Sequence, residues 1–197
     1  MTSHKVLWKT GLIVITAGFV VSLCSKLGYW SIRTELTSIS TPNWMRIRYI
    51  VFYAMPMAFM ILHYLTNRNK KIESFYIFSC LLMAGQAGVR AIEYFKAGEK
   101  LLFTGLEALI LIGFIICLAE SQAHSKRRWL PLLIFFIVLV LHTFFTVRDT
   151  ILLPEYGMDN NALVRLFYFL SECGLILFDF SAFTDLYNRR DEAVDKE

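Results

Sequence analysis

Six apolar segments, each about as long as a bilayer is thick, dominate the chain and leave only short polar breaks between them. A membrane-spanning α-helix needs roughly 20 predominantly apolar residues, and 56% of the 197 residues are hydrophobic while 18% are charged. The strands of a β-barrel would instead alternate apolar and polar residues. We therefore predict an all-α, polytopic membrane protein: a six-transmembrane-helix bundle forming one integral membrane domain over 1–197. The predicted spans are 10–30, 47–66, 73–95, 101–120, 130–153 and 162–187, followed by a short cytoplasmic tail at 188–197.

The polar breaks predict which side of the membrane each one faces. Three Lys or Arg residues lie in 67–73 and three more in 121–129, and the tail includes Arg189 and Arg190, whereas 154–161 carries acids only. Lys and Arg accumulate on the cytoplasmic side of membrane proteins. The pattern therefore predicts that both termini are cytoplasmic (N-in/C-in), in a multi-pass protein of the bacterial cytoplasmic, or inner, membrane.

Local features refine the first three spans. The basic start before the first apolar run also fits a signal peptide, but no A-x-A-like cleavage site follows, so we expect the segment to be retained. Pro56 lies inside the second span and predicts a kink there, because proline cannot donate the helical hydrogen bond. In the third span Gly85, Ala87 and Gly88 predict a face that lets a neighbouring helix approach closely.

The last span carries three ionisable residues on one face. Arg165, Glu172 and Asp179 follow each other at intervals of seven residues, nearly two helical turns. An ionisable group in hydrocarbon costs at least ~2.5–3.5 kcal/mol on insertion scales. Charged side chains on this face are tolerated only where the face contacts protein or water. We therefore predict that this face points to the inside of the bundle.

The remaining intramembrane charges allow two interpretations. Near the outer ends of the spans the basic and acidic residues balance, which favours a structural ion-pair network that holds the helices together. Nearer the midplane and below it, His142, Glu172 and Asp179 have no basic partner at their predicted depth. This excess favours an outward-facing polar cavity that binds a ligand or forms part of a conduction path. We also expect Glu172 to hydrogen bond with His142. The balanced outer set is Arg90, Glu93, Glu107, Arg148, Asp149 and Arg165.

Signatures of catalysis and metal binding are few. The chain has no HExxH, GxSxG, phosphate-binding glycine loop or CxxC motif, so we assign no catalytic residue, metal or cofactor. His63 and His124 lie at predicted cytoplasmic ends and are expected to be surface residues. Four single cysteines, at positions 24, 80, 117 and 173, are expected to be small buried hydrophobic residues.

Three classes of function fit this architecture. The first is a non-enzymatic sensor, scaffold or partner-binding subunit, such as the membrane component of a bacterial stress or antiviral defence system with a soluble cytoplasmic effector. Its partners would be the lipid bilayer and a cytoplasmic protein that contacts 67–73, 121–129 and 188–197; a homo-oligomer is compatible, and nucleic acid is not expected. The second is a small transporter or channel that uses the outer cavity. The third is an intramembrane acid–base enzyme built on His142, Glu172 and Asp149. We rank them in this order because catalytic motifs and the broken paired helices of many transporters are missing.

Overall fold

The computed structural model describes residues 2–37, 41–66, 73–122, 129–152 and 161–194, and these residues form helices and no strand. Six helical segments are long and apolar enough to cross a membrane, which confirms the all-α prediction and is compatible with an integral membrane protein. The first and last helices extend beyond the predicted spans at 10–30 and 162–187. The elements are α1 (Thr2–Thr37), α2 (Asn43–Tyr49), the π-helix η1 (Ile50–Ala54), α3 (Met55–Leu65), α4 (Glu73–Lys96), α5 (Leu101–Gln122), α6 (Trp129–Leu152) and α7 (Ala162–Val194).

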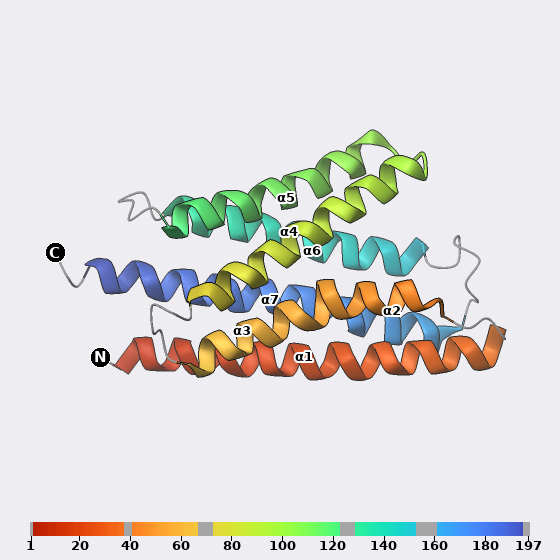
Figure 1. Cartoon of the computed structure of the whole chain (residues 1–197), viewed down its shortest axis with the longest axis horizontal. Helices are drawn as coiled ribbons and strands as arrows, with labels where there is room; N and C mark the ends of the chain where they lie inside the picture. The colour runs from red at the N-terminus through yellow and green to blue at the C-terminus, as the bar shows by residue number, and fades with distance from the viewer. Residues whose placement is uncertain (1, 38–40, 67–72, 123–128, 153–160, 195–197) are drawn as a thin grey trace.

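The six long segments form a closed ring. Each packs against the next in the chain, in the order α1, α3, α4, α5, α6 and α7, and α7 returns to pack against α1 in the most extensive contact of the bundle. Both termini lie at the same end of the bundle (Figure 1). We call this the termini end and the opposite one the distal end. Because the helices surround a common interior, side chains from all six segments can meet there.

The contact between α1 and α7 depends on small residues. A Cβ added at Gly18 would lie 2.9 Å from Leu177 Cβ, and one at Gly174 would lie 2.6 Å from Ser22 Cβ. Side chains there would push the two backbones apart. The predicted small face of the third span has a more modest role: a Cβ at Gly85 would meet the Phe52 ring at 3.0 Å, whereas Gly88 has looser surroundings.

The second span changes its hydrogen-bonding pattern just before Pro56. This segment consists of α2, η1 and α3 in direct succession, and the π-helix Ile50–Ala54 ends two residues before the proline. Pro56 has no N–H to offer the carbonyl one turn earlier, and π-bulges accommodate such a mismatch and often occur at functional sites. Tyr53, within η1, is buried in the interior of the bundle.

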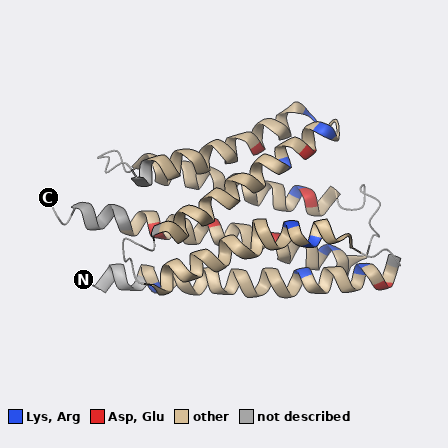
Figure 2. Cartoon of the chain, in the orientation of Figure 1, with Lys and Arg blue, Asp and Glu red and all other residues tan. Residues whose placement is uncertain are grey.

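Polar and apolar side chains are distributed inside out relative to a soluble protein. Large apolar side chains such as Phe78, Ile92 and Phe95 are exposed on the outside of α4. Arg90 on the same helix is 6% exposed, and Glu107 on α5 is fully buried. Many of the charged residues gather towards the distal end (Figure 2). The interior at this end is therefore the place to look for a functional site.

Candidate functional site

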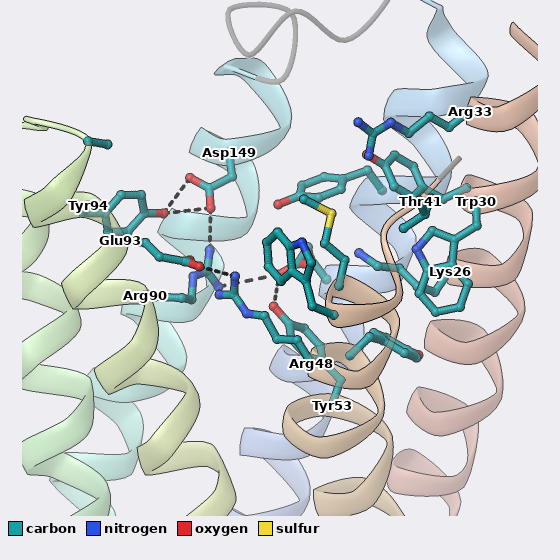
Figure 3. Close-up of a pocket in the computed structure, with 17 residues that line it drawn as sticks. Lys26, Trp30, Arg33, Thr41, Arg48, Tyr53, Arg90, Glu93, Tyr94 and Asp149 are labelled. Atoms are coloured by element: carbon teal, nitrogen blue, oxygen red, sulfur yellow. Dashed lines mark hydrogen bonds and ion pairs between the residues drawn. The ribbon is translucent and has the colours of Figure 1, made fainter. Parts of the chain in front are cut away.

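A cavity of about 390 Å³ lies at the distal end, between α1, α2, η1, α4, α6 and α7 (Figure 3). Its lining combines charged and aromatic side chains. The basic residues are Lys26, Arg33, Arg48 and Arg90, the acidic residues are Glu93, Asp149 and Glu172, and the aromatic residues are Tyr29, Trp30, Trp44, Tyr49, Tyr53, Tyr94 and Tyr168.

Arg90 joins three other helices to α4 beneath the cavity. Its Nε lies 3.1 Å from Glu107 Oε1 on α5, and its Nη1 lies 3.6 Å from Glu172 Oε2 on α7. A third ion pair links Arg90 to Asp149 on α6. All four side chains are nearly or fully buried. We call these four residues the Arg90 cluster. Because one guanidinium is shared by acids from three helices, a shift of any of these helices disturbs an ion pair.

Two tyrosines and a glutamine orient the acids of this cluster. The Tyr53 hydroxyl donates to Glu172 Oε2 (3.2 Å) and accepts a hydrogen bond from Gln86 Nε2 (2.9 Å). The Tyr94 hydroxyl lies 2.9 Å from Asp149 Oδ2. Tyrosines near span ends are typical of membrane interfaces, so the sequence gives no signal that these two point inward.

Two more ion pairs lie around the cavity, each with a partner that the sequence analysis did not single out. Glu93 pairs with Arg48 of α2 (2.5 Å), and the two side chains are 46% and 24% exposed. Arg148 pairs with Glu99, between α4 and α5 (2.6 Å), and its guanidinium carbon lies 3.8 Å from the centroid of the Phe103 ring. Five of the six residues in the balanced outer set therefore form ion pairs, and Glu93 and Arg148 do so with residues outside that set.

Below the Arg90 cluster, His142 on α6 forms a fully buried pair with Asp179 on α7. The expectation that Glu172 and Asp179 lack a basic partner is therefore wrong, because Arg90 and His142 pair with them. The expected hydrogen bond between His142 and Glu172 is wrong as well, because His142 bonds with Asp179. Seven residues separate His142 from Asp149 on α6, and seven separate Glu172 from Asp179 on α7. In these antiparallel helices, His142 lies level with Asp179, and Asp149 with Glu172.

A second histidine pair lies nearer the termini end. His63 Nε2 on α3 is 3.1 Å from Asp185 Oδ1 on α7, and both side chains are buried. The expectation of a surface role for His63 is therefore wrong, while His124 lies outside the described residues. Asp185 was not singled out because it lies close to the predicted end of the last span. We call His142–Asp179 and His63–Asp185 the inner pairs.

The predicted site residues thus fall into three groups. Four of them line the cavity, two lie one contact away from it, and three lie elsewhere. The cavity-lining group is Arg90, Glu93, Asp149 and Glu172; the neighbouring group is Glu107 and Arg148; the remaining residues are His142 and Asp179, deeper in the bundle, and Arg165, a half-buried residue near the start of α7.

Lys26 is a cavity residue that the sequence analysis missed. It lies inside the first predicted span, where a lysine surrounded by apolar residues is itself a signal of an inward-facing polar site. Its ammonium nitrogen lies 5.1 Å from the ring centroids of both Tyr29 and Tyr168, and 5.7 Å from that of Tyr49. The ammonium group is therefore enclosed by three tyrosine rings.

The cysteines and the metal-binding residue types give no alternative site. Cys80 and Cys117 are buried, as predicted, but Cys24 is exposed, and all four cysteines are free thiols. Within the described ranges, no group of three or more His, Cys, Asp or Glu side chains is placed to hold a metal ion. Comparison with family models, curated proteins and solved structures finds no match for the chain.

Proposed function

We propose that the protein is a multi-pass membrane receptor, a non-enzymatic sensor subunit whose cavity binds a small ligand. The cavity volume of about 390 Å³ falls in the range typical of small-molecule sites, roughly 300–1,000 Å³. Such sites combine apolar and aromatic walls with a few polar groups that orient the ligand, and the seven aromatic and seven charged residues of this lining fit that description.

The distribution of basic residues supports an orientation for this receptor. With 67–73, 121–129 and the tail 188–197 in the cytoplasm, the topology is N-in/C-in and the cavity opens to the outside. In a bacterium this membrane would be the inner one. The same three segments would then be the surface that meets a cytoplasmic partner, for example the soluble effector of a stress or defence system.

The observation that carries this proposal is the position of the Arg90 cluster beneath the cavity. A ligand that touches Asp149 or Glu172 also acts on Arg90, and through it on Glu107. Four helices and η1 share these contacts. A change in occupancy therefore has a direct route to the helix packing, which is what a membrane receptor requires.

The experiment compares small molecules that copurify with the parent protein and with a variant whose cavity is blocked. Ala97 lines the cavity and is exposed, so Ala97→Trp adds bulk there without displacing a core side chain. Ile92, an exposed residue of α4 outside the lining, provides Ile92→Trp as the matched control. We expect mass spectrometry to find a compound enriched in the parent and the control and lost in Ala97→Trp. Identical small-molecule content in all three would contradict the proposal.

A second candidate function, transport, is favoured by the inner pairs. They continue the line of buried ionisable groups from Glu172 towards the termini end, and Glu172 and Asp179 are about 10 Å apart along α7 at 1.5 Å per residue. Chains of buried acids and histidines are typical of proton relays in transporters.

This alternative is tested in proteoliposomes that contain a pH-sensitive dye. Proton flux that is present in the parent and lost in Asp179→Asn would favour transport over sensing. Proteoliposomes no more permeable to protons than empty liposomes would contradict proton transport and leave the receptor.

A further inference from the structure

The charged side chains are distributed unevenly around the cavity. On one side lie Arg90, Glu93 and Asp149, whose basic and acidic groups are paired, and on the other lie Lys26 and Arg33 (Figure 3). The second side, formed largely by α1, carries cations and hydroxyl groups. This asymmetry gives the cavity a side rich in hydrogen-bond donors.

The Lys26 ammonium has no carboxylate at ion-pair distance within the part of the chain that the structure describes. Glu172 is the acid whose charge attracts Lys26 most strongly, but its Oε2 is already shared by Tyr53 and Arg90. An ammonium group inside a membrane protein is costly without a partner, and contacts with tyrosine rings compensate for it only in part.

The other acids of the lining are also engaged. Glu93 is held by Arg48, and Asp149 is held by Arg90, Arg148 and the Tyr94 hydroxyl. Each of these contacts satisfies a carboxylate at the side of the cavity away from Lys26. None of the described acids therefore supplies a counter-ion for Lys26 at contact distance.

Further donors face the same space as the Lys26 ammonium. The Tyr168 hydroxyl forms no hydrogen bond with another described residue. Arg33 also lines the cavity and brings a second positive charge to it, on a guanidinium whose N–H groups are all donors. An ammonium, a guanidinium and a phenolic hydroxyl together are suited to a carboxylate or a phosphate. The nearby rings of Trp30, Trp44 and Tyr49 are suited to an apolar group.

We propose that the cavity binds a small organic anion, whose carboxylate or phosphate is held by Lys26 and Arg33 and whose apolar part lies against the aromatic residues. This inference rests on the proposed receptor function and specifies its ligand class. A free solute and the headgroup of an anionic lipid both present this chemistry, so the experiment has an arm for each.

The first arm uses two probes with the same apolar body and opposite charge, 3-phenylpropionate and 3-phenylpropan-1-amine, titrated calorimetrically into the purified full-length protein. We expect the carboxylate to bind the parent about tenfold or more tightly than the amine, because an ammonium–carboxylate contact is a charge-assisted hydrogen bond. Lys26→Gln should lose about this factor, whereas Lys26→Arg should keep most of the affinity. Melting curves verify that each variant is folded.

Lys9→Gln is the matched control, because Lys9 is an exposed lysine on the same helix near the termini end. It should bind 3-phenylpropionate as the parent does. If the parent binds both probes measurably and with equal affinity, the proposal is overturned. A folded Lys26→Gln variant that binds the carboxylate as tightly as the parent does would also overturn it.

The second arm compares nanodiscs of phosphatidylcholine with nanodiscs that also contain phosphatidylglycerol. If a lipid headgroup is the anion, phosphatidylglycerol should raise the melting temperature of the parent and of Lys9→Gln, but not that of Lys26→Gln. If neither the carboxylate at millimolar concentration nor the anionic lipid binds the parent in a Lys26-dependent way, the anion proposal is wrong. The receptor proposal is tested separately, by the comparison of the parent with Ala97→Trp.

Discussion

The two ends of the bundle use similar buried ion pairs in different surroundings. At the distal end the Arg90 cluster borders a cavity, and its acids are shared among several donors from different helices. Towards the termini end the inner pairs each join one histidine to one aspartate, and none of these four residues lines the cavity. Buried ionisable residues thus occur in two different arrangements.

The packing around the pairs explains why this difference matters. Near His63, the Tyr64 hydroxyl donates to the Ser181 carbonyl at 2.6 Å, and a Cβ at Gly11 would lie 2.2 Å from that hydroxyl. A pair enclosed this closely holds helices together but cannot exchange its partner for a ligand. A pair beside an open cavity can. Burial of a charge alone therefore does not make a residue a candidate for ligand binding, whereas burial beside open volume does.

The largest effect is expected from Arg90→Met. This substitution removes the cation shared by Glu107, Asp149 and Glu172 and leaves three buried acids without it. Breaking a buried pair costs about 3–5 kcal/mol. We expect the variant to express poorly or to melt at a sharply lower temperature in detergent. A melting temperature equal to that of the parent would show that water reaches these acids and that the cluster contributes little to the packing.

Asp179→Ala should cost about 3 kcal/mol, because it leaves buried His142 without its carboxylate partner. It should not change the affinity for an anionic probe, since neither residue lines the cavity. The double variant His142→Leu/Asp179→Leu should recover much of the stability, because an apolar replacement of both partners leaves no buried charge. Altered probe binding in a folded Asp179 variant would show that the inner pairs belong to the binding site.

Glu172→Gln should cost only about 1 kcal/mol, because Arg90 keeps two acids and the amide oxygen can still accept the Tyr53 hydrogen bond. Its effect should appear in binding instead. Removing a negative charge near Lys26 should strengthen binding of 3-phenylpropionate by about threefold at the effective dielectric of a partly hydrated site. Weaker carboxylate binding by a folded Glu172→Gln variant would contradict the assignment of anion chemistry to this cavity.

The smallest effect is expected for the pair at the edge of the cavity. Glu93 is 46% exposed and its partner Arg48 is 24% exposed, so solvent screens their attraction. Exposed pairs contribute about 0–1 kcal/mol, and Glu93→Gln should shift the melting temperature only slightly. A loss comparable to that of Arg90→Met would show that the cavity edge is as closed as the interior.

Much of the fold follows from the sequence, because the length of an apolar run is a local property that determines whether a helix can cross a bilayer. The helix ends follow less directly from the sequence. The prediction ends the first span at residue 30, yet α1 continues to Thr37, past Arg33 and Glu35. A helix can continue beyond its apolar part because polar residues also adopt the helical conformation.

The partners within the site do not follow from the sequence, because they depend on helix rotation and register. Arg90, Asp149 and Glu172 could be placed inside the bundle from their charge alone. That Glu93 meets Arg48, and that Asp179 rather than Glu172 meets His142, depends on how far neighbouring helices are displaced along their axes. Arg165, Glu172 and Asp179 follow each other on one face of α7 at intervals of seven residues. Sliding a neighbouring helix along α7 by seven residues would therefore exchange one of these partners for the next without changing the helix face.

Accessibility of introduced cysteines distinguishes a distal end that is open to solvent from a termini end that is closed. In a protein with its four native cysteines replaced, Met45→Cys places a thiol in the cavity lining and Ala182→Cys places one at a fully buried position of α7. Intact cells, and opened cells whose cytoplasmic face is accessible, are treated with a membrane-impermeant thiol reagent. We expect rapid labelling of Met45→Cys, protection of it by 3-phenylpropionate, and no labelling of Ala182→Cys. Labelling of Met45→Cys only after the cells are opened would contradict a cavity that opens to the outside. Labelling of both positions at the same rate would contradict the difference between an open distal end and a closed termini end.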